Sequence, residues 1–145
     1  MKLSEAIRLG EFALPPTYGA WFTRHLLTGK LCGGCAMGRA LYAAGYRPHE
    51  MSFAERASQF KRHGEVGYFH AEYTKICAFV EQQWPWTAKG HLRDEGYNLI
   101  VNHISSLYEG YHPMPYIAEQ IEALEATFDS PPAAVDAALQ PEEVR

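Results

Sequence analysis

The sequence lacks any apolar stretch long enough to cross a membrane. Near its start, charged residues such as Lys2, Glu5 and Arg8 interrupt the apolar ones, so neither a signal peptide nor a membrane anchor is expected there. Gly34 and Gly38, four residues apart, are typical of helix pairs in membranes, but that motif needs roughly twenty flanking apolar residues. We therefore expect a cytoplasmic protein with no membrane partner.

Cysteine is also scarce. The chain has 3 cysteines in 145 residues, and an odd number without a secretory signal fits a reducing compartment better than a disulfide scaffold. The formal net charge is −4, which argues against non-specific attraction to a phosphate backbone. Nucleic acid is therefore not an expected partner.

Sustained alternation of apolar and polar residues is absent as well, and we find no internal repeat. Apolar residues instead recur every three or four positions, which predicts amphipathic helices. We expect an all-α fold, a compact single-domain bundle of five to seven helices over residues 1–128, followed by a Pro/Ala-rich acidic tail, 129–145.

The expected helices cover residues 4–9, 19–27, 34–45, 52–64, 69–84, 97–110 and 115–128. Ser52 is expected to cap the fourth of them. The apolar faces that hold Phe69, Tyr73 and Tyr97 should pack in the core, whereas Glu125 of the last helix should face water.

The helix expected at about 34–45 is the one around which the others should pack. Its glycines and alanines allow a neighbouring helix to approach closely, although a glycine inside a helix costs about 1 kcal/mol relative to alanine. Gly45 suits the left-handed position after the helix end, and Pro48 prevents continuation. We expect a central helix that another helix crosses tightly.

The motif Cys32-Gly33-Gly34-Cys35 is the strongest local candidate for a binding site. Two thiols three residues apart at a helix start can have a lowered pKa and exchange disulfides, or they can supply half of a zinc site. The expected preceding helix disfavours a thioredoxin-like arrangement, which has a strand there. A zinc site would need further ligands, from Cys77 and one of His25, His63 and His70. Structural, buried cysteines are the favoured interpretation, with no cofactor, and zinc is the alternative.

Recognisable catalytic motifs are missing: the chain has no nucleophile elbow, no H-E-x-x-H and no phosphate-binding loop. Aromatic residues, in contrast, make up 13% of the chain, and clustered aromatics are enriched at protein interfaces. We expect an exposed aromatic surface around Trp21, Trp84 and Trp86.

These features favour a non-catalytic interaction or regulatory module that binds a protein partner or a second copy of itself. Two alternatives stay open. One is a small metal-binding or thiol-redox protein built on Cys32 and Cys35. The other is an acidic inhibitor of a host or defence protein complex, whose binding to a basic partner would depend strongly on salt.

Overall fold

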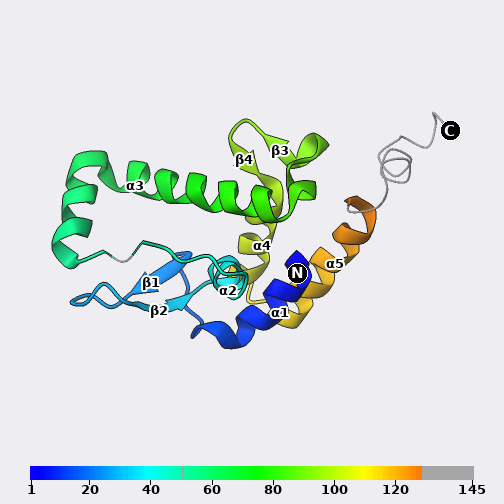
Figure 1. The fold of residues 1–145 in the computed structure, drawn as a ribbon, viewed down its shortest axis with the longest axis horizontal. Helices are drawn as coiled ribbons and strands as arrows, with labels where there is room; N and C mark the ends of the chain where they lie inside the picture. The colour runs from blue at the N-terminus through cyan, green and yellow to red at the C-terminus, as the bar shows by residue number, and fades with distance from the viewer. Residues whose placement is uncertain (50, 129–145) are drawn as a thin grey trace.

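The computed structural model describes residues 1–49 and 51–128, so the predicted tail lies outside the described residues. The described part of the chain holds five α-helices and two small pairs of strands, which confirms the mostly helical, compact fold. In Figure 1 the short helix α2 (Ala36–Ala43) lies in the middle. The helices α1 (Leu3–Ala13) and α5 (Met114–Phe128) lie on one side of it.

The central helix is confirmed, and it is crossed tightly, as predicted. A Cβ atom added at Gly10 of α1 would lie 2.8 Å from the backbone nitrogen of Ala40 in α2. Such a contact is too short for any side chain, so α1 can cross α2 only at a glycine. Helix α1 continues through Gly10 to Ala13, whereas the sequence predicted that it ends near Gly10.

The predicted helix at 19–27 is wrong. Strand β1 (Phe22–Arg24) pairs antiparallel with strand β2 (Leu31–Gly34). At the turn the backbone amide of His25 donates to the carbonyl of Lys30, and Gly29 adopts a positive φ of 71°. Strands of three and four residues are too short for their alternation to be visible in the sequence.

Helix α3 (Phe53–Gln83) contains both of the helices predicted at 52–64 and 69–84. It begins at the predicted cap, where the Ser52 hydroxyl accepts a hydrogen bond from the Glu55 amide at 3.2 Å. Gly64 interrupts it with φ of 72° and ψ of 167°, a conformation that glycine adopts at little cost. The helix resumes immediately, so the two halves meet at a kink.

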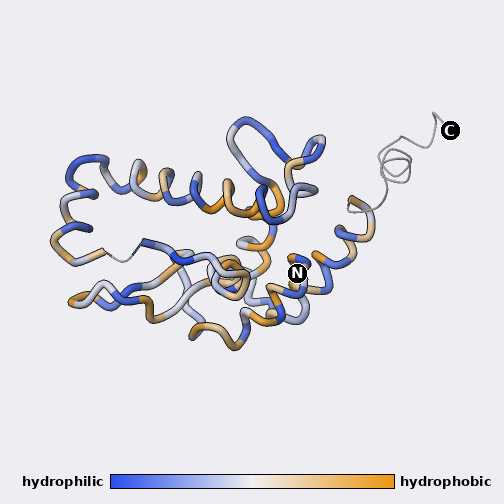
Figure 2. Tube along the Cα trace, in the orientation of Figure 1, coloured by the Kyte–Doolittle hydropathy of each residue, from blue (hydrophilic) through white to orange (hydrophobic). Residues whose placement is uncertain are grey.

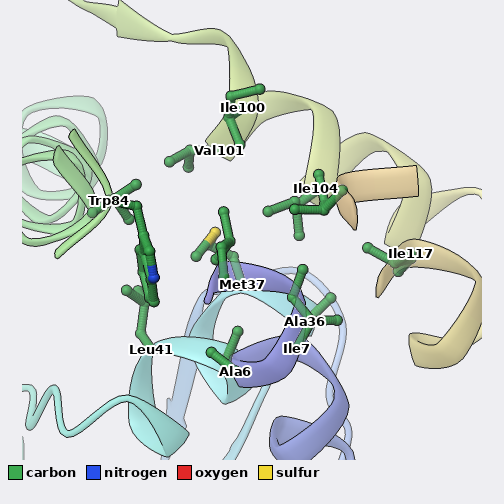
Figure 3. Packing of buried hydrophobic residues seen from close by; sticks show 14 of the residues in the cluster. Ala6, Ile7, Ala36, Met37, Leu41, Trp84, Ile100, Val101, Ile104 and Ile117 are labelled. Atoms are coloured by element: carbon green, nitrogen blue, oxygen red, sulfur yellow. The ribbon is translucent and has the colours of Figure 1, made fainter. Parts of the chain in front are cut away.

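Two 3₁₀ turns, Pro85–Ala88 and Gly90–Leu92, and a short pair of strands, β3 (Arg93–Asp94) and β4 (Tyr97–Asn98), connect α3 to helix α4 (Leu99–Glu109). Helix α4 thus begins two residues later than predicted. Apolar residues gather toward the middle of the molecule in Figure 2. There, Met37 and Leu41 of α2 pack between Ala6 and Ile7 of α1 and the α4 residues Ile100, Val101 and Ile104 (Figure 3).

None of the described helices combines the length and the apolar character needed to cross a membrane.

Candidate functional site

Two adjoining cavities lie between α3, α4 and the segment before β1. The inner cavity has a volume of about 370 Å³ and the outer one about 490 Å³. Both are lined by Trp21, Phe69 and Asn102, and we call the two adjoining cavities together the Trp21 groove. The inner cavity is also lined by Gly19, Ala20, Cys35, Ser105, Ser106, Tyr108 and Glu109, and the outer one by Glu65, Val66, His70, Tyr73 and Tyr97.

Gly34 at the end of β2 and Gly38 in α2 allow Trp21 to lie in the groove. The carbonyl of Trp21 accepts a hydrogen bond from the Cys35 amide at 3.1 Å. A Cβ atom at Gly38 would collide with that carbonyl oxygen, and one at Gly34 would lie 2.9 Å from it. Only glycine at these two positions lets the Trp21 backbone lie directly on the start of α2, and its half-buried ring then reaches α3.

Aromatic rings meet at an angle in the outer cavity. The ring of Trp21 lies 5.7 Å from that of Tyr73, centroid to centroid, at 36°, and 6.5 Å from that of Phe69 at 60°. Tyr73 in turn lies 6.2 Å from Tyr97 at 53°. Because the rings are tilted and not stacked flat, they form adjoining walls.

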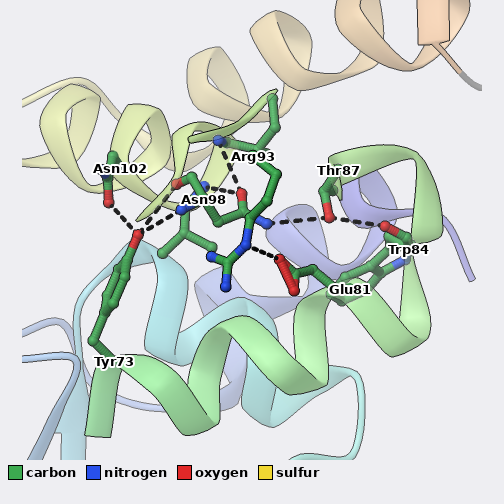
Figure 4. A network of polar contacts seen from close by, with 9 residues as sticks. Tyr73, Glu81, Trp84, Thr87, Arg93, Asn98 and Asn102 are labelled. Carbon is green, nitrogen blue, oxygen red and sulfur yellow. Dashed lines mark hydrogen bonds and ion pairs between the residues drawn. The ribbon is translucent and has the colours of Figure 1, made fainter. Parts of the chain in front are cut away.

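A polar network that includes the buried Asn98 fixes the Tyr73 wall (Figure 4). The Tyr73 hydroxyl donates to Asn102 Oδ1 at 2.8 Å and accepts from the Asn98 backbone amide at 2.9 Å. Burial raises the pKa of Tyr73 to about 12, so this hydroxyl keeps its proton at neutral pH. Asn98 is fully buried and caps α4, because its Oδ1 accepts from the amides of Ile100 and Val101.

The floor of the inner cavity carries polar atoms without partners. Ser105 Oγ and the Tyr108 hydroxyl are buried, and neither makes a hydrogen bond within the described residues. Cys35, only 7% exposed, also lines this cavity. Among residues 1–49 and 51–128, the lining of the groove includes the carboxylates of Glu65 and Glu109 and no lysine or arginine. The groove is therefore aromatic and acidic.

The structure corrects the predicted exposed aromatic surface. Trp84 and Trp86 are only 4% and 3% exposed. The 3₁₀ turn that starts at Pro85 directs both rings inward, where Trp84 Nε1 donates to the Met1 carbonyl at 3.0 Å and Trp86 stacks on Phe128. Of the three tryptophans, Trp21 is the one that lines the groove.

The two cysteines of the Cys32-Gly33-Gly34-Cys35 motif are separated by the fold. Cys32 is exposed on β2, and its thiol donates to the Thr23 carbonyl at 3.5 Å, whereas Cys35 caps α2 and is buried. Gly33 and Gly34 are buried beneath the segment that holds Pro15. Of the four, Cys35 alone lines the groove.

Cys35 is buried, in agreement with the favoured interpretation, whereas Cys32 is exposed. Burial raises the pKa of the Cys35 thiol, whereas the redox alternative needs a lowered pKa. The first three residues of the motif lie in strand β2, and strand β1, not a helix, precedes them as the other half of an antiparallel hairpin. Across residues 1–49 and 51–128, no three His, Cys, Asp or Glu side chains are grouped so that they could hold a metal ion.

Sequence reasoning missed most of the groove. Phe69, Tyr73 and Tyr97 fit apolar helix faces and were therefore expected in the core. Phe69 and Tyr73 are four residues apart on one side of α3, and Glu65 lies four residues before Phe69. The spacing of Glu65, Phe69 and Tyr73 was the feature of the sequence that could have indicated the groove. Only the tertiary structure brings Trp21 and Tyr97 beside these residues.

The chain matches no protein-family model, and neither the curated proteins nor the solved structures contain a match to it.

Proposed function

We propose that this protein is a non-catalytic, cytoplasmic interaction module, and that its Trp21 groove binds a segment of a partner protein that carries lysine or arginine side chains. The observation that supports this function most directly is the composition of the groove. Aromatic side chains line two adjoining cavities, and the only charged groups among the described lining residues are the carboxylates of Glu65 and Glu109.

Charge complementarity favours a basic partner. The carboxylates of Glu65 and Glu109 are exposed at the groove, and an acidic surface steers a basic partner toward it. The net charge of −4 acts in the same direction. An acidic inhibitor of a basic protein would use the same groove.

The thiol alternative has less support. A redox pair needs a reactive thiolate, but burial raises the pKa of Cys35. Self-association stays a prediction, which the mass of the protein in solution would test.

A peptide array tests the proposal before any partner has been identified. Immobilised peptides of matched length and aromatic content would differ only in carrying lysine and arginine, or glutamate and aspartate. We expect the protein to bind the basic set preferentially. We also expect this binding to weaken from about 50 to about 500 mM salt, because added ions screen the exposed charges.

Two variants of α3 provide the matched comparison. Phe69→Ala removes a wall that both cavities share, whereas Phe53→Ala removes an exposed ring that lines neither cavity. Circular dichroism would establish that both variants are folded. Binding that is lost in Phe69→Ala and retained in Phe53→Ala supports the proposal, whereas equal binding of acidic and basic peptides would overturn it.

A further inference from the structure

We infer that the outer cavity of the Trp21 groove is an aromatic cage for an alkylated ammonium group, such as that of trimethyllysine or choline. This inference rests on the proposed function for its location, and it names the chemistry of the group that enters. It follows from the ring geometry, the scarcity of free hydrogen-bond acceptors and the carboxylate of Glu65.

The rings provide the walls of the cage. Trp21, Phe69, Tyr73 and Tyr97 all line the outer cavity, and neighbouring rings are tilted by 36° to 60°. A cation is attracted to the negative face of an aromatic ring, and quaternary ammonium groups are commonly bound by several such faces. The cavity, of about 490 Å³, is open to solvent beside the exposed Val66 and Tyr97, so such a group can enter from that side.

The polar lining distinguishes an alkylated ammonium from other cations. An unmodified lysine has three N–H donors and an arginine has five, and all of them lose water on entry. Aromatic rings make up half of the residues that line the cavity, and Asn102 Oδ1 already accepts from the Tyr73 hydroxyl, so the Glu65 carboxylate and a few polar side chains would have to replace that water. A quaternary ammonium has no N–H group, so it loses no hydrogen bonds when it enters.

Glu65 supplies the charge. It lies at the start of the second half of α3, directly after the kink at Gly64, and it lines the outer cavity. It forms no ion pair within the described part of the chain. Its carboxylate is therefore free to face a bound cation, without a resident lysine or arginine to compete.

The first test uses choline and its uncharged analogue, in which carbon replaces nitrogen and the shape is retained. Two-dimensional NMR follows the backbone amide and indole N–H signals of the protein during titration, with the Trp21 indole assigned from a Trp21→Phe variant. We expect choline to shift the Trp21 signal in a saturable manner. The uncharged analogue should bind about tenfold more weakly, because it lacks the cation–π attraction.

Two pairs of variants locate the binding. Tyr97→Ala removes an exposed wall and should weaken choline binding about fivefold, whereas Tyr116→Ala, which removes a partly exposed ring outside the groove, should not. Glu65→Gln should weaken it about threefold. Glu119→Gln, which removes the same charge from the exposed face of α5, should leave it unchanged.

The source of the ammonium group is tested with blocked single amino acids. Trimethyllysine that binds more tightly than choline would assign the cage to a modified protein side chain, and the reverse order would assign it to a free small molecule. Either order supports the inference. Equal binding of choline and its uncharged analogue, or no binding of either, would overturn it.

This test and the peptide array can fail separately. If unmodified basic peptides bind through Phe69 but alkylated ammonium groups do not, the proposed function stands and the cage is wrong. If choline binds in the cage but no peptide binds, the cage stands and the proposed function fails.

Discussion

Replacement of Gly38 by alanine tests the close contact that places Trp21 in the groove. A methyl group at this position would overlap the Trp21 carbonyl oxygen and lie 2.8 Å from its carbonyl carbon. Carbon atoms in good contact are about 3.5–4.0 Å apart. The backbone around Trp21 would therefore have to move away from α2 by roughly 1 Å.

Three contributions set the size of the effect. Overpacking of this kind costs about 2 kcal/mol, and weakening the bond from the Cys35 amide to the Trp21 carbonyl costs about 1 kcal/mol. Alanine favours the helix over glycine by about 1 kcal/mol, which offsets part of the loss. The net expectation is a decrease of about 2 kcal/mol in the free energy of unfolding, or about 6–8 °C in Tm.

Urea and thermal unfolding followed by circular dichroism measure this change. The matched control is Gly67→Ala on α3, where an added methyl group would meet only the Cβ atom of His63, at 3.3 Å. This variant should be as stable as the wild type or more stable by up to about 1 kcal/mol. If Gly38→Ala were as stable as Gly67→Ala, the contact between Trp21 and α2 would not restrict residue 38, and the reasoning would be refuted.

The remaining predictions concern titrating groups. Under native conditions iodoacetamide should alkylate the exposed Cys32 first, because burial raises the pKa of Cys35 and Cys77. Intact-protein mass spectrometry measures the order of alkylation, and a Cys35 that reacted as fast as Cys32 would contradict the prediction. The folded-state pKa of Tyr73, about 12, exceeds the ordinary value of 10.0, so stability should fall as pH rises from 10 to 12. The wild type should lose more stability than Tyr73→Phe over that range in urea titrations, and parallel losses would contradict this reasoning.

Local signals in the sequence were sufficient to predict most of the helices. The small residues before Gly45, the serine cap at Ser52 and the apolar spacing up to Phe128 each depend on neighbours within a few positions. They predicted α2, the start of α3 and α5 to within two residues. The close crossing of α1 over α2 followed from the same small residues, although its exact place, Gly10, did not.

The features that the sequence predicted wrongly depend mostly on residues that are distant along the chain. The backbone of Trp21 bonds to Cys35 across the hairpin, and this non-local pairing overrides the helical pattern at 19–27. Trp84 is buried because it meets Met1, which is 83 positions away. Glu125, which was expected to face water, is buried because it lies on the same side of α5 as Ile121 and Phe128.

The Trp21 groove was beyond prediction for the same reason. The residues that line it come from the segment before β1, from helices α3 and α4, and from strand β4. No spacing rule relates Trp21 to Tyr97. The sequence identified Trp21 and Cys35 as candidates, but it grouped Trp21 with Trp84 and Trp86, which are buried elsewhere, and Cys35 with Cys32, which lies outside the groove.

The backbone and side-chain amides of Asn98 join the groove to the start of helix α4. The hydrogen bonds of Asn98 join the Tyr73 hydroxyl on α3, Thr87 in the first 3₁₀ turn and the first amides of α4. Loss of any one of these partners leaves a polar group at Asn98 unpaired, at a cost of about 1–3 kcal/mol. Amide hydrogen exchange should therefore be slowed at the start of α4, where these hydrogen bonds end. Whatever occupies the groove should slow exchange in α3 and α4 together, because residues of both helices line it.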